Sequence, residues 1–339
     1  LLSEMIHNPY VNEDLIARGI QFLRTTSGKQ LIPFSELKAE DIVIIPAFGT
    51  TLETQQLLTD IGVDVEAYNT TCPFVEKVWN RSSQIGTKNY TVVVHGKRYH
   101  EETRATVSHA QAVAPVIVVR DLEEAEKLAS VVRGEKNADY FFEHFSERYS
   151  PDFDPNRDLQ RLGVVNQTTM LATETTEIAA LLKQAVLDRD GNGDDDGAAE
   201  LGSFADTSDT LCYATNENQD ATRFLIDDGA DLAIIVGGTN SSNTSHLVEL
   251  CEDVMPTYFV SGDDNLISNT EIRHFNYQSK QYEMSHDWLP NQKPVDILLT
   301  AGASCPDVLL DRVMERICSW FPDTRSAEET LQPFMNLNS

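Results

Sequence analysis

The sequence predicts an α/β fold with a mostly parallel sheet, and two patterns carry this prediction. Short apolar runs that suit buried strands alternate with longer runs whose apolar residues recur at helical spacing, as in parallel strands joined by helices. At least five of the short runs end in small, polar or glycine-containing turns directly before a helix, which is where open α/β sheets bind their ligands. The 339 residues suffice for two or three domains of ordinary size.

The first quarter of the chain contains two predicted helices and two predicted strands. Apolar residues recur at helical spacing over 12–23 and 52–61. The run 41–46 is typical of a buried strand and is closed by Ala47-Phe48-Gly49-Thr50, and a second strand-like run covers 63–68. This second run leads directly to the first cysteine of the chain.

The rest of the chain repeats the order of strand, polar turn and helix. The clearest strand, 90–96, is rich in β-branched residues and ends on His-Gly. Further strands are expected within residues 116–119, 163–169, 232–238 and 296–304, and further helices over 122–132, 174–187, 221–226 and 306–317. The turns after these strands contain Ser, Thr, Asn and His, which can bind phosphate as neutral donors.

Composition excludes several classes of partner. The net charge is −28, from 54 acidic and 26 basic residues, which argues against nucleic acid and anionic membranes as partners. No apolar run reaches the about 18 residues that a membrane helix needs. The five cysteines are odd in number and widely spread, which indicates a reducing compartment rather than a disulfide framework. The chain opens without Met and in the middle of a pattern, so we expect that an N-terminal piece is missing.

Cys72 stands at the predicted junction of a strand with a helix, and Pro73 suits the first position of that helix. A thiol at a helix N-terminus faces unpaired N–H groups and the positive end of the helix dipole, which favour the thiolate that binds metals. Cys212 precedes a second helical run in the same way. The two cysteines are therefore candidates for one shared metal centre, and the alternative is that each is a small buried apolar residue.

A second group of candidates lies in the segment 95–103 (HGKRYHEET), which follows the clearest strand. A histidine beside a glutamate can transfer protons when burial and neighbouring charges tune each pKa, and the alternative is an exposed polar loop. His7, His95 and His100 are not spaced as a zinc motif. Residues that suit helix caps, and so also anion binding at a helix N-terminus, are Thr168, Ser241, Ser242, Asn243 and Ser304.

One segment looks inserted. Residues 188–197 (DRDGNGDDDG) resemble a calcium-binding loop in their spacing of Asp, Asn and Gly. The twelfth position of such a loop needs a bidentate glutamate, and here it is Ala199. We therefore expect a solvated acidic insert over 188–200.

Taken together, eight strings resemble the LytB family, the 4-hydroxy-3-methylbut-2-enyl diphosphate reductases. In chain order they are IHNPYVN, PAFGTT, TTCPFVEKVW, HGKRYHEET, NQTTM, CYATNENQDA, GGTNSSNTSHL and TAGASCPD. The resemblance runs from Ile6 to about Ile317, and PAFG and NQTTM are similar to the plant and cyanobacterial branch.

The resemblance implies three pseudo-equivalent αβα domains with mostly parallel sheets around a central cleft. The implied domains are 1–71, whose N-terminal part is missing, 72–209 with the acidic insert 188–200, 210–304, and 305–339 as a C-terminal helix and tail that pack back on the first domain.

The resemblance also implies a [4Fe-4S] cluster held by three cysteines. Cys72 and Cys212 match the second and third ligands, and the first is expected upstream of Leu1, so we expect this chain alone to hold the cluster poorly. Glu102 matches the family's proton-delivering glutamate, with Thr168 near the substrate hydroxyl. The implied substrate-binding residues are His7, His100, Thr168, Ser241, Ser242, Asn243 and Ser304.

The implied reaction is the reductive dehydroxylation of (E)-4-hydroxy-3-methylbut-2-enyl diphosphate to isopentenyl and dimethylallyl diphosphate. It is the last step of the methylerythritol phosphate pathway of isoprenoid biosynthesis, and it implies an electron donor such as ferredoxin or flavodoxin. The implied compartment is the cytoplasm of a bacterium or the plastid stroma of a photosynthetic eukaryote. Phe48 stands where many bacterial members have a histidine, which removes one diphosphate donor. The alternative function is a non-catalytic diphosphate-binding paralogue without a cluster.

Overall fold

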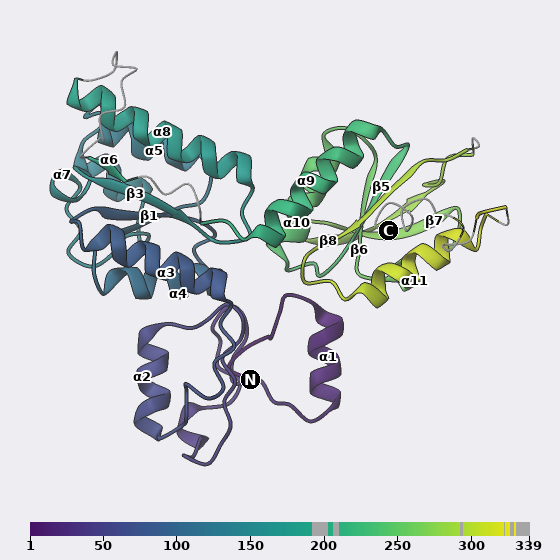
Figure 1. Cartoon of the computed structure of the whole chain (residues 1–339), viewed down its shortest axis with the longest axis horizontal. Coiled ribbons are helices and arrows are strands. Elements are labelled where there is room, and N and C mark those ends of the chain that lie inside the picture. The colour runs from purple at the N-terminus through teal and green to yellow at the C-terminus, as the bar shows by residue number, and fades with distance from the viewer. Residues whose placement is uncertain (192–202, 206–209, 292–293, 322, 326–328, 330–339) are drawn as a thin grey trace, which may run out of the picture. The chain divides into compact units, whose positions relative to one another are not determined.

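The computed structural model describes residues 1–191, 203–205, 210–291, 294–321, 323–325 and 329 (Figure 1). These residues form helices and mostly parallel sheets, which confirms the predicted α/β class. The chain divides into two compact units, Leu1–Gln219 and Asp220–Ser339, and each is described by itself. Most of the predicted acidic insert, from residue 192 on, and the tail from residue 330 on lie outside the described residues.

The N-terminal part of the first unit contains two α-helices and long irregular segments. Its elements are α1 (Pro9–Ala17), the 3-10 helix η1 (Phe34–Glu36) and α2 (Leu52–Ile61). The side chain of Asn8 accepts a hydrogen bond from the N–H of Tyr10 and caps α1, so this helix begins and ends earlier than the predicted helix 12–23. The bounds of α2 agree with the prediction.

The two strands predicted in this part of the chain are wrong. Apart from an isolated parallel bridge between Ile45 and Asn69, the segments 41–46 and 63–68 are irregular. Val43 and Val63 are nevertheless buried in a small core. The apolar pattern there arises from burial in this core, without a hydrogen-bonded ladder to form a sheet.

A four-stranded parallel sheet forms the centre of the first unit, with the strand order β2-β1-β3-β4. Val92 and Val94 of β1 pack with α3 and α4, whereas Val93 packs with α5 and α8, so alternate side chains face helices on the two sides of the sheet (Figure 1). The elements are α3 (Pro73–Gly86), β1 (Thr91–His95), α4 (Glu101–Gln111), β2 (Val116–Val119), α5 (Leu122–Val132), α6 (Ala138–His144), α7 (Pro155–Asp158), β3 (Leu162–Asn166), α8 (Ala172–Asp190) and β4 (Phe204–Ala205).

The second unit contains a three-stranded parallel sheet of order β6-β5-β9 and an antiparallel hairpin, β7–β8, that was not predicted. The helix α11 packs Leu309, Val313 and Ile317 into the core around β5, and the expected packing of the C-terminal helix and tail on the first domain stays a prediction. These residues are four apart and so share one face of the helix. The elements are α9 (Tyr213–Asp228), which crosses the division between the units, β5 (Leu232–Val236), α10 (Ser242–Glu252), β6 (Thr257–Val260), the 3-10 helix η2 (Asp263–Asn265), β7 (Glu271–Asn276), β8 (Gln281–His286), β9 (Ile297–Ala301) and α11 (Asp307–Cys318).

Across the described residues, no helix combines the length and the apolar character that crossing a bilayer requires.

Candidate functional site

The structure brings the segments around the two candidate metal-binding cysteines together within the first unit. Cys72 is the N-cap of α3, with Pro73 in the first turn, and its N–H donates to the carbonyl oxygen of Ala47 at 2.9 Å. Cys212 directly precedes α9. The rings of Phe74 and Tyr213, close behind the two cysteines, contact each other with centroids 5.1 Å apart. Two helix N-termini that each begin with a cysteine therefore lie side by side.

The chemistry of these two thiols suits metal binding. Among the described residues, Sγ of Cys72 makes no capping hydrogen bond with its helix, so the sulfur is able to act as a ligand beside a helix N-terminus. Burial, together with a nearby carboxylate, raises the pKa of Cys251 and of Cys305 to about 11, so those thiols stay protonated. No group of three metal-ligating side chains occurs within the described residues. Cys72 and Cys212, each at the start of a helix, stay the candidate metal ligands of the chain.

Glu102 lies buried beside Thr168, far from solvent. Its side chain is 1% exposed. One carboxylate oxygen accepts the N–H of Thr168 at 2.5 Å and the other accepts its hydroxyl at 2.9 Å. Burial raises the pKa of Glu102 to about 7, against the opposing effect of the two hydrogen bonds from Thr168. A carboxyl with such a pKa can both hold and release a proton near neutral pH.

The loop that carries Thr168 also contacts the second cysteine. The N–H of Cys212 donates to the carbonyl oxygen of Thr168 at 3.3 Å. The buried amide of Gln219, further along α9, accepts the N–H of Ala172 and donates to the carbonyl oxygen of Met170. Glu102, Thr168 and Cys212 are therefore connected by hydrogen bonds.

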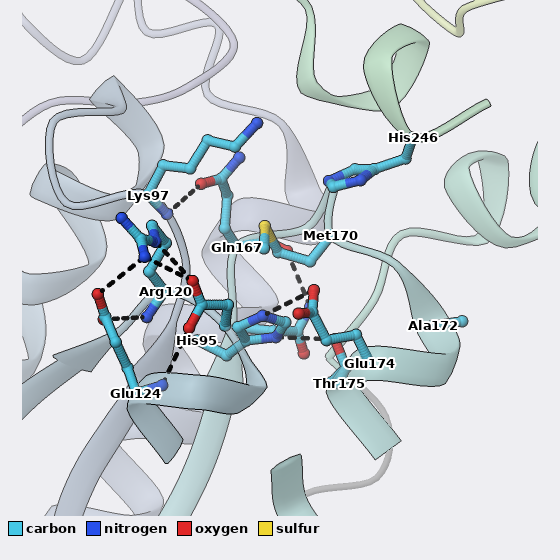
Figure 2. Close-up of polar contacts among 12 residues, drawn as sticks. His95, Lys97, Arg120, Glu124, Gln167, Met170, Ala172, Glu174, Thr175 and His246 are labelled. Carbon is cyan, nitrogen blue, oxygen red and sulfur yellow. Dashed lines mark hydrogen bonds and ion pairs between the residues drawn. The ribbon is translucent and has the colours of Figure 1, made fainter. Parts of the chain in front are cut away.

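Gln167 was not among the predicted site residues. Its side chain connects the segment that carries Glu102 with the loop that carries Thr168. Its side-chain oxygen accepts the N–H of Lys97 at 3.1 Å (Figure 2). The same oxygen accepts the hydroxyl of Thr103 at 3.0 Å, and the amide nitrogen donates to Thr169. Gln167 thereby joins the first turn of α4 to the loop after β3. In the sequence, Gln167 stood out only by its polarity and by its position after a strand. Its hydrogen-bond partners could not be predicted from these two properties.

His95, which stood beside the candidate residues in the sequence, has a different role. It is fully buried, its Nδ1 lies 3.0 Å from the hydroxyl of Thr175, and its Nε2 lies 3.6 Å from the carboxylate of Glu174 (Figure 2). These contacts hold the first turn of α8 against the end of β1. His95 stabilises the strand end and does not join His100.

His7 and His100 form a pair, although they lie 93 positions apart. Their Nε2 atoms are 3.0 Å apart. Nδ1 of His100 accepts the N–H of Glu102 at 3.3 Å, and since a backbone N–H can only donate, the proton of a neutral His100 is on Nε2. Burial, with further effects of neighbouring cations, lowers the pKa of His100 well below its usual value. His100 is thus a neutral donor through Nε2.

Phe48 packs against both histidines. Its ring is stacked on His7 with centroids 4.2 Å apart and meets His100 edge-on at 5.7 Å. An apolar ring thus occupies the position at which the family resemblance implies a histidine, a further diphosphate donor, in many bacterial members. Phe48, His7 and His100 thus form one cluster of rings in the first unit.

The remaining candidates lie together in the second unit. The hydroxyl of Ser241 accepts the N–H of Thr244 and caps α10, and Ser242 and Asn243 in its first turn are buried. The side-chain oxygen of Asn243 accepts the N–H of Ala303 at 2.7 Å, which joins this helix N-terminus to the turn that carries Ser304. Hydroxyls and N–H groups at a helix N-terminus form a ready anion site. The predicted residues therefore fall into two groups, one in each unit.

Comparisons with known proteins show the family of this chain. The sequence model described as LytB protein matches residues 1–318. The 4-hydroxy-3-methylbut-2-enyl diphosphate reductase of Crocosphaera subtropica is 38% identical over 318 residues, 94% of this chain and 75% of that protein. The enzyme of the same name from Picosynechococcus is 39% identical over 316 residues, 93% of this chain and 75% of that protein.

Two solved structures are similar as well. One is the structure of (E)-4-hydroxy-3-methyl-but-2-enyl diphosphate reductase described as the terminal enzyme of the non-mevalonate pathway, with a TM-score of 0.52, 25% identity and coverage of 94% of this chain and 87% of that one. The other is the E-1-hydroxy-2-methyl-but-2-enyl-4-diphosphate reductase of Plasmodium falciparum, with a TM-score of 0.61, 19% identity and coverage of 93% and 77%. The second likeness concerns the fold alone.

Proposed function

Because this chain belongs to the LytB protein family, we propose that it is an oxidoreductase that acts on (E)-4-hydroxy-3-methylbut-2-enyl diphosphate. It converts this substrate to isopentenyl and dimethylallyl diphosphate by reductive dehydroxylation, the last step of the methylerythritol phosphate pathway. The observation that carries the proposal is the buried Glu102–Thr168 pair, whose loop is hydrogen-bonded to Cys212. The reaction needs a proton donor close to a metal centre. The loop of Thr168 connects such a donor, Glu102, with a candidate metal ligand, Cys212.

The cofactor is the [4Fe-4S] cluster of the family. Cys72 and Cys212 are the residues of this chain that would hold it, with the third cysteine expected upstream of Leu1. When bound, the cluster supplies electrons and an open iron that acts as a Lewis acid. The electron donor that we propose is a ferredoxin or flavodoxin, and the compartment is the cytoplasm of a bacterium or the plastid stroma.

The residues of this chain bind the substrate and supply a proton. His7 and His100, with Ser241, Ser242, Asn243 and Ser304, bind the diphosphate. Since the whole chain carries a charge of −28, these local N–H and O–H donors must hold the anion against the overall field. Glu102, protonated near neutral pH, gives its proton to the departing hydroxyl, and Thr168 holds the carboxyl in place by its two hydrogen bonds.

The three-domain division into 1–71, 72–209 and 210–304 remains part of the proposal. Its support is that the apolar cores are separate: one, around Leu2 and Leu58, lies within 1–71, two lie on the faces of the first sheet within 72–209, and two lie on the faces of the second sheet, of which one also includes residues of α11 after 304.

The experiment is anaerobic turnover of the substrate by the native full-length protein, with its upstream segment present and a reduced electron donor. We expect both diphosphate products, and an oxygen-sensitive cluster that Cys72→Ser or Cys212→Ser abolishes. Cluster-free protein that still binds diphosphates after anaerobic reconstitution would instead favour the non-catalytic paralogue.

A further inference from the structure

A buried ion cluster of Arg24, Glu101 and Arg104 lies in the first unit, and the mechanism above does not use it. Glu101 is the first residue of α4, and its side chain is only 4% exposed. Its carboxylate lies 3.8 Å from the guanidinium of Arg104, and the charge of Arg24 acts on it as well. Burial raises the pKa of Glu101, while Ser3, the two arginines and His7 oppose this effect. Glu101 and Glu102 are thus adjacent in sequence but have different partners.

The guanidinium of Arg24 holds a loop as well as facing Glu101. One nitrogen donates to the hydroxyl of Thr50 at 3.0 Å and the other lies 3.4 Å from the hydroxyl of Thr54. Thr50 is 1% exposed. A planar guanidinium with two fixed donors sets the position of such a loop more closely than a flexible ammonium would.

The loop held by Arg24 carries Phe48 two residues before Thr50. Gly49 between them has φ of +71°, and a side chain there would meet Trp79 at 2.5 Å, so the backbone has little freedom. The ring of Phe48 in turn contacts both His7 and His100. Contacts therefore run without a gap from the ion cluster to the two imidazoles.

We propose that Arg24 is a positioning residue for diphosphate binding: through Thr50 it fixes Phe48, whose ring sets the orientation of the two histidines. The inference rests on the proposed function, because it takes the diphosphate as the ligand of the histidines. The negative charge of Glu101 favours the charged form of Arg24, against the effect of burial.

Two substitutions weaken or remove the hydrogen bond between Arg24 and Thr50 without changing the charge of the site. Arg24→Lys keeps the cation and loses the two-donor geometry, and Thr50→Val keeps the size of the side chain and loses the acceptor. If Arg24 positions the loop, both variants should weaken pyrophosphate binding to a similar extent, and the double variant should bind little worse than either single variant. A role of charge alone predicts no effect of either.

The test is a titration of the full chain, without cluster, with inorganic pyrophosphate, followed by NMR of the histidine ring protons. Stacking on Phe48 shifts the ring protons of His7, so their resonances report the position of the loop. We expect each variant to weaken pyrophosphate binding about tenfold and to move the His7 resonances toward those of an unstacked imidazole. In the cluster-loaded enzyme, KM should rise with kcat nearly unchanged.

Glu124→Gln is the matched control. Glu124 is also a buried carboxylate between two arginines, Arg120 and Arg148, and Figure 2 shows its contact with Arg120. Glu124→Gln should lower the melting temperature, as Arg24→Lys and Thr50→Val should, but it should leave the pyrophosphate affinity and the His7 resonances unchanged.

The outcomes separate this inference from the proposed function. A wild-type chain that binds no pyrophosphate overturns both. A wild-type chain that binds it, with Arg24→Lys and Thr50→Val binding equally well and showing unchanged His7 resonances, overturns only the role of Arg24.

Discussion

Glu101 and Glu102 show how environment gives two neighbouring carboxyls different roles. Burial raises the pKa of both. Glu101 faces two arginines, which favour its charged form and suit it to hold structure. Glu102 has only the neutral donors of Thr168 and therefore keeps a pKa of about 7, which suits it to transfer a proton.

At this scale the first prediction concerns turnover. Glu102→Gln keeps the size of the side chain and removes the transferable proton, so kcat should fall by about a hundredfold or more. Iron and sulfide content should remain that of the wild type. Anaerobic steady-state kinetics measure the change, with Glu124→Gln as the control for loss of a buried carboxylate. Unchanged turnover in Glu102→Gln would refute its role as proton donor.

The second residue-scale prediction concerns stability and pH. Because the pKa of Glu102 is raised from 4.5 to about 7, the native state binds the proton more tightly than the unfolded state, and its stability falls as pH rises through this interval. Glu102→Gln removes this dependence. Relative to wild type, the free energy of unfolding of the variant should therefore improve by up to about 3 kcal/mol between pH 4.5 and pH 8.

Urea titrations at several pH values measure this difference, and the comparison of the two proteins cancels the titration of the other carboxyls. A constant difference across this range would show that Glu102 titrates normally.

At the scale of elements, the loop 47–50 tolerates little change at Gly49. Gly49→Ala places a side chain at φ of +71° and 2.5 Å from Trp79, which should cost about 2–3 kcal/mol of unfolding free energy. In a Trp79→Leu background the overlap is gone, and the cost should fall to about 1 kcal/mol. Chemical denaturation of the four proteins of this cycle measures the coupling; equal costs in both backgrounds would contradict it.

Elements with a strong local signal were predictable from sequence. The helices 52–61 and 122–132 agree with α2 and α5 because helical apolar spacing and an N-cap occur together there. The hairpin β7–β8 was missed because β8 is largely exposed: Tyr282 and Met284 alternate with polar residues, but neither is buried, and the strand has no β-branched residue. The segments 41–46 and 63–68 were predicted as strands from their apolar residues, but only some of these, such as Val43 and Val63, are buried, and the backbone of both segments is irregular.

The candidate site divides in the same way. Cys72 at a helix N-terminus follows from local sequence, and the structure has it there. The contact of His7 with His100 and the electrostatic interaction of Arg24 with Glu101 join residues more than 70 positions apart, and local spacing carries no information on them. Roles in the site stay predictions that the variants above test.

At the scale of the whole molecule, charge is the dominant property. With 54 acidic and 26 basic residues, most carboxylates have no cation to pair with, and they repel one another in the compact state. Raising KCl from 0.1 to 1 M shortens the screening length from about 10 Å to about 3 Å. The melting temperature should therefore rise by several degrees, as calorimetry can measure. A melting temperature that stays constant or falls with KCl would contradict this view.

The hydrogen bond from Cys72 to Ala47 has a consequence for how the chain responds to its ligands. Ala47 precedes Phe48, so one short loop contacts the thiol segment through one residue and an imidazole through the next. Energetic linkage between two such sites is reciprocal. At the cluster and diphosphate sites proposed above, a phosphate ester bound at the histidines would raise the affinity of the thiols for iron, and loss of iron would weaken the binding of the ester by the same factor.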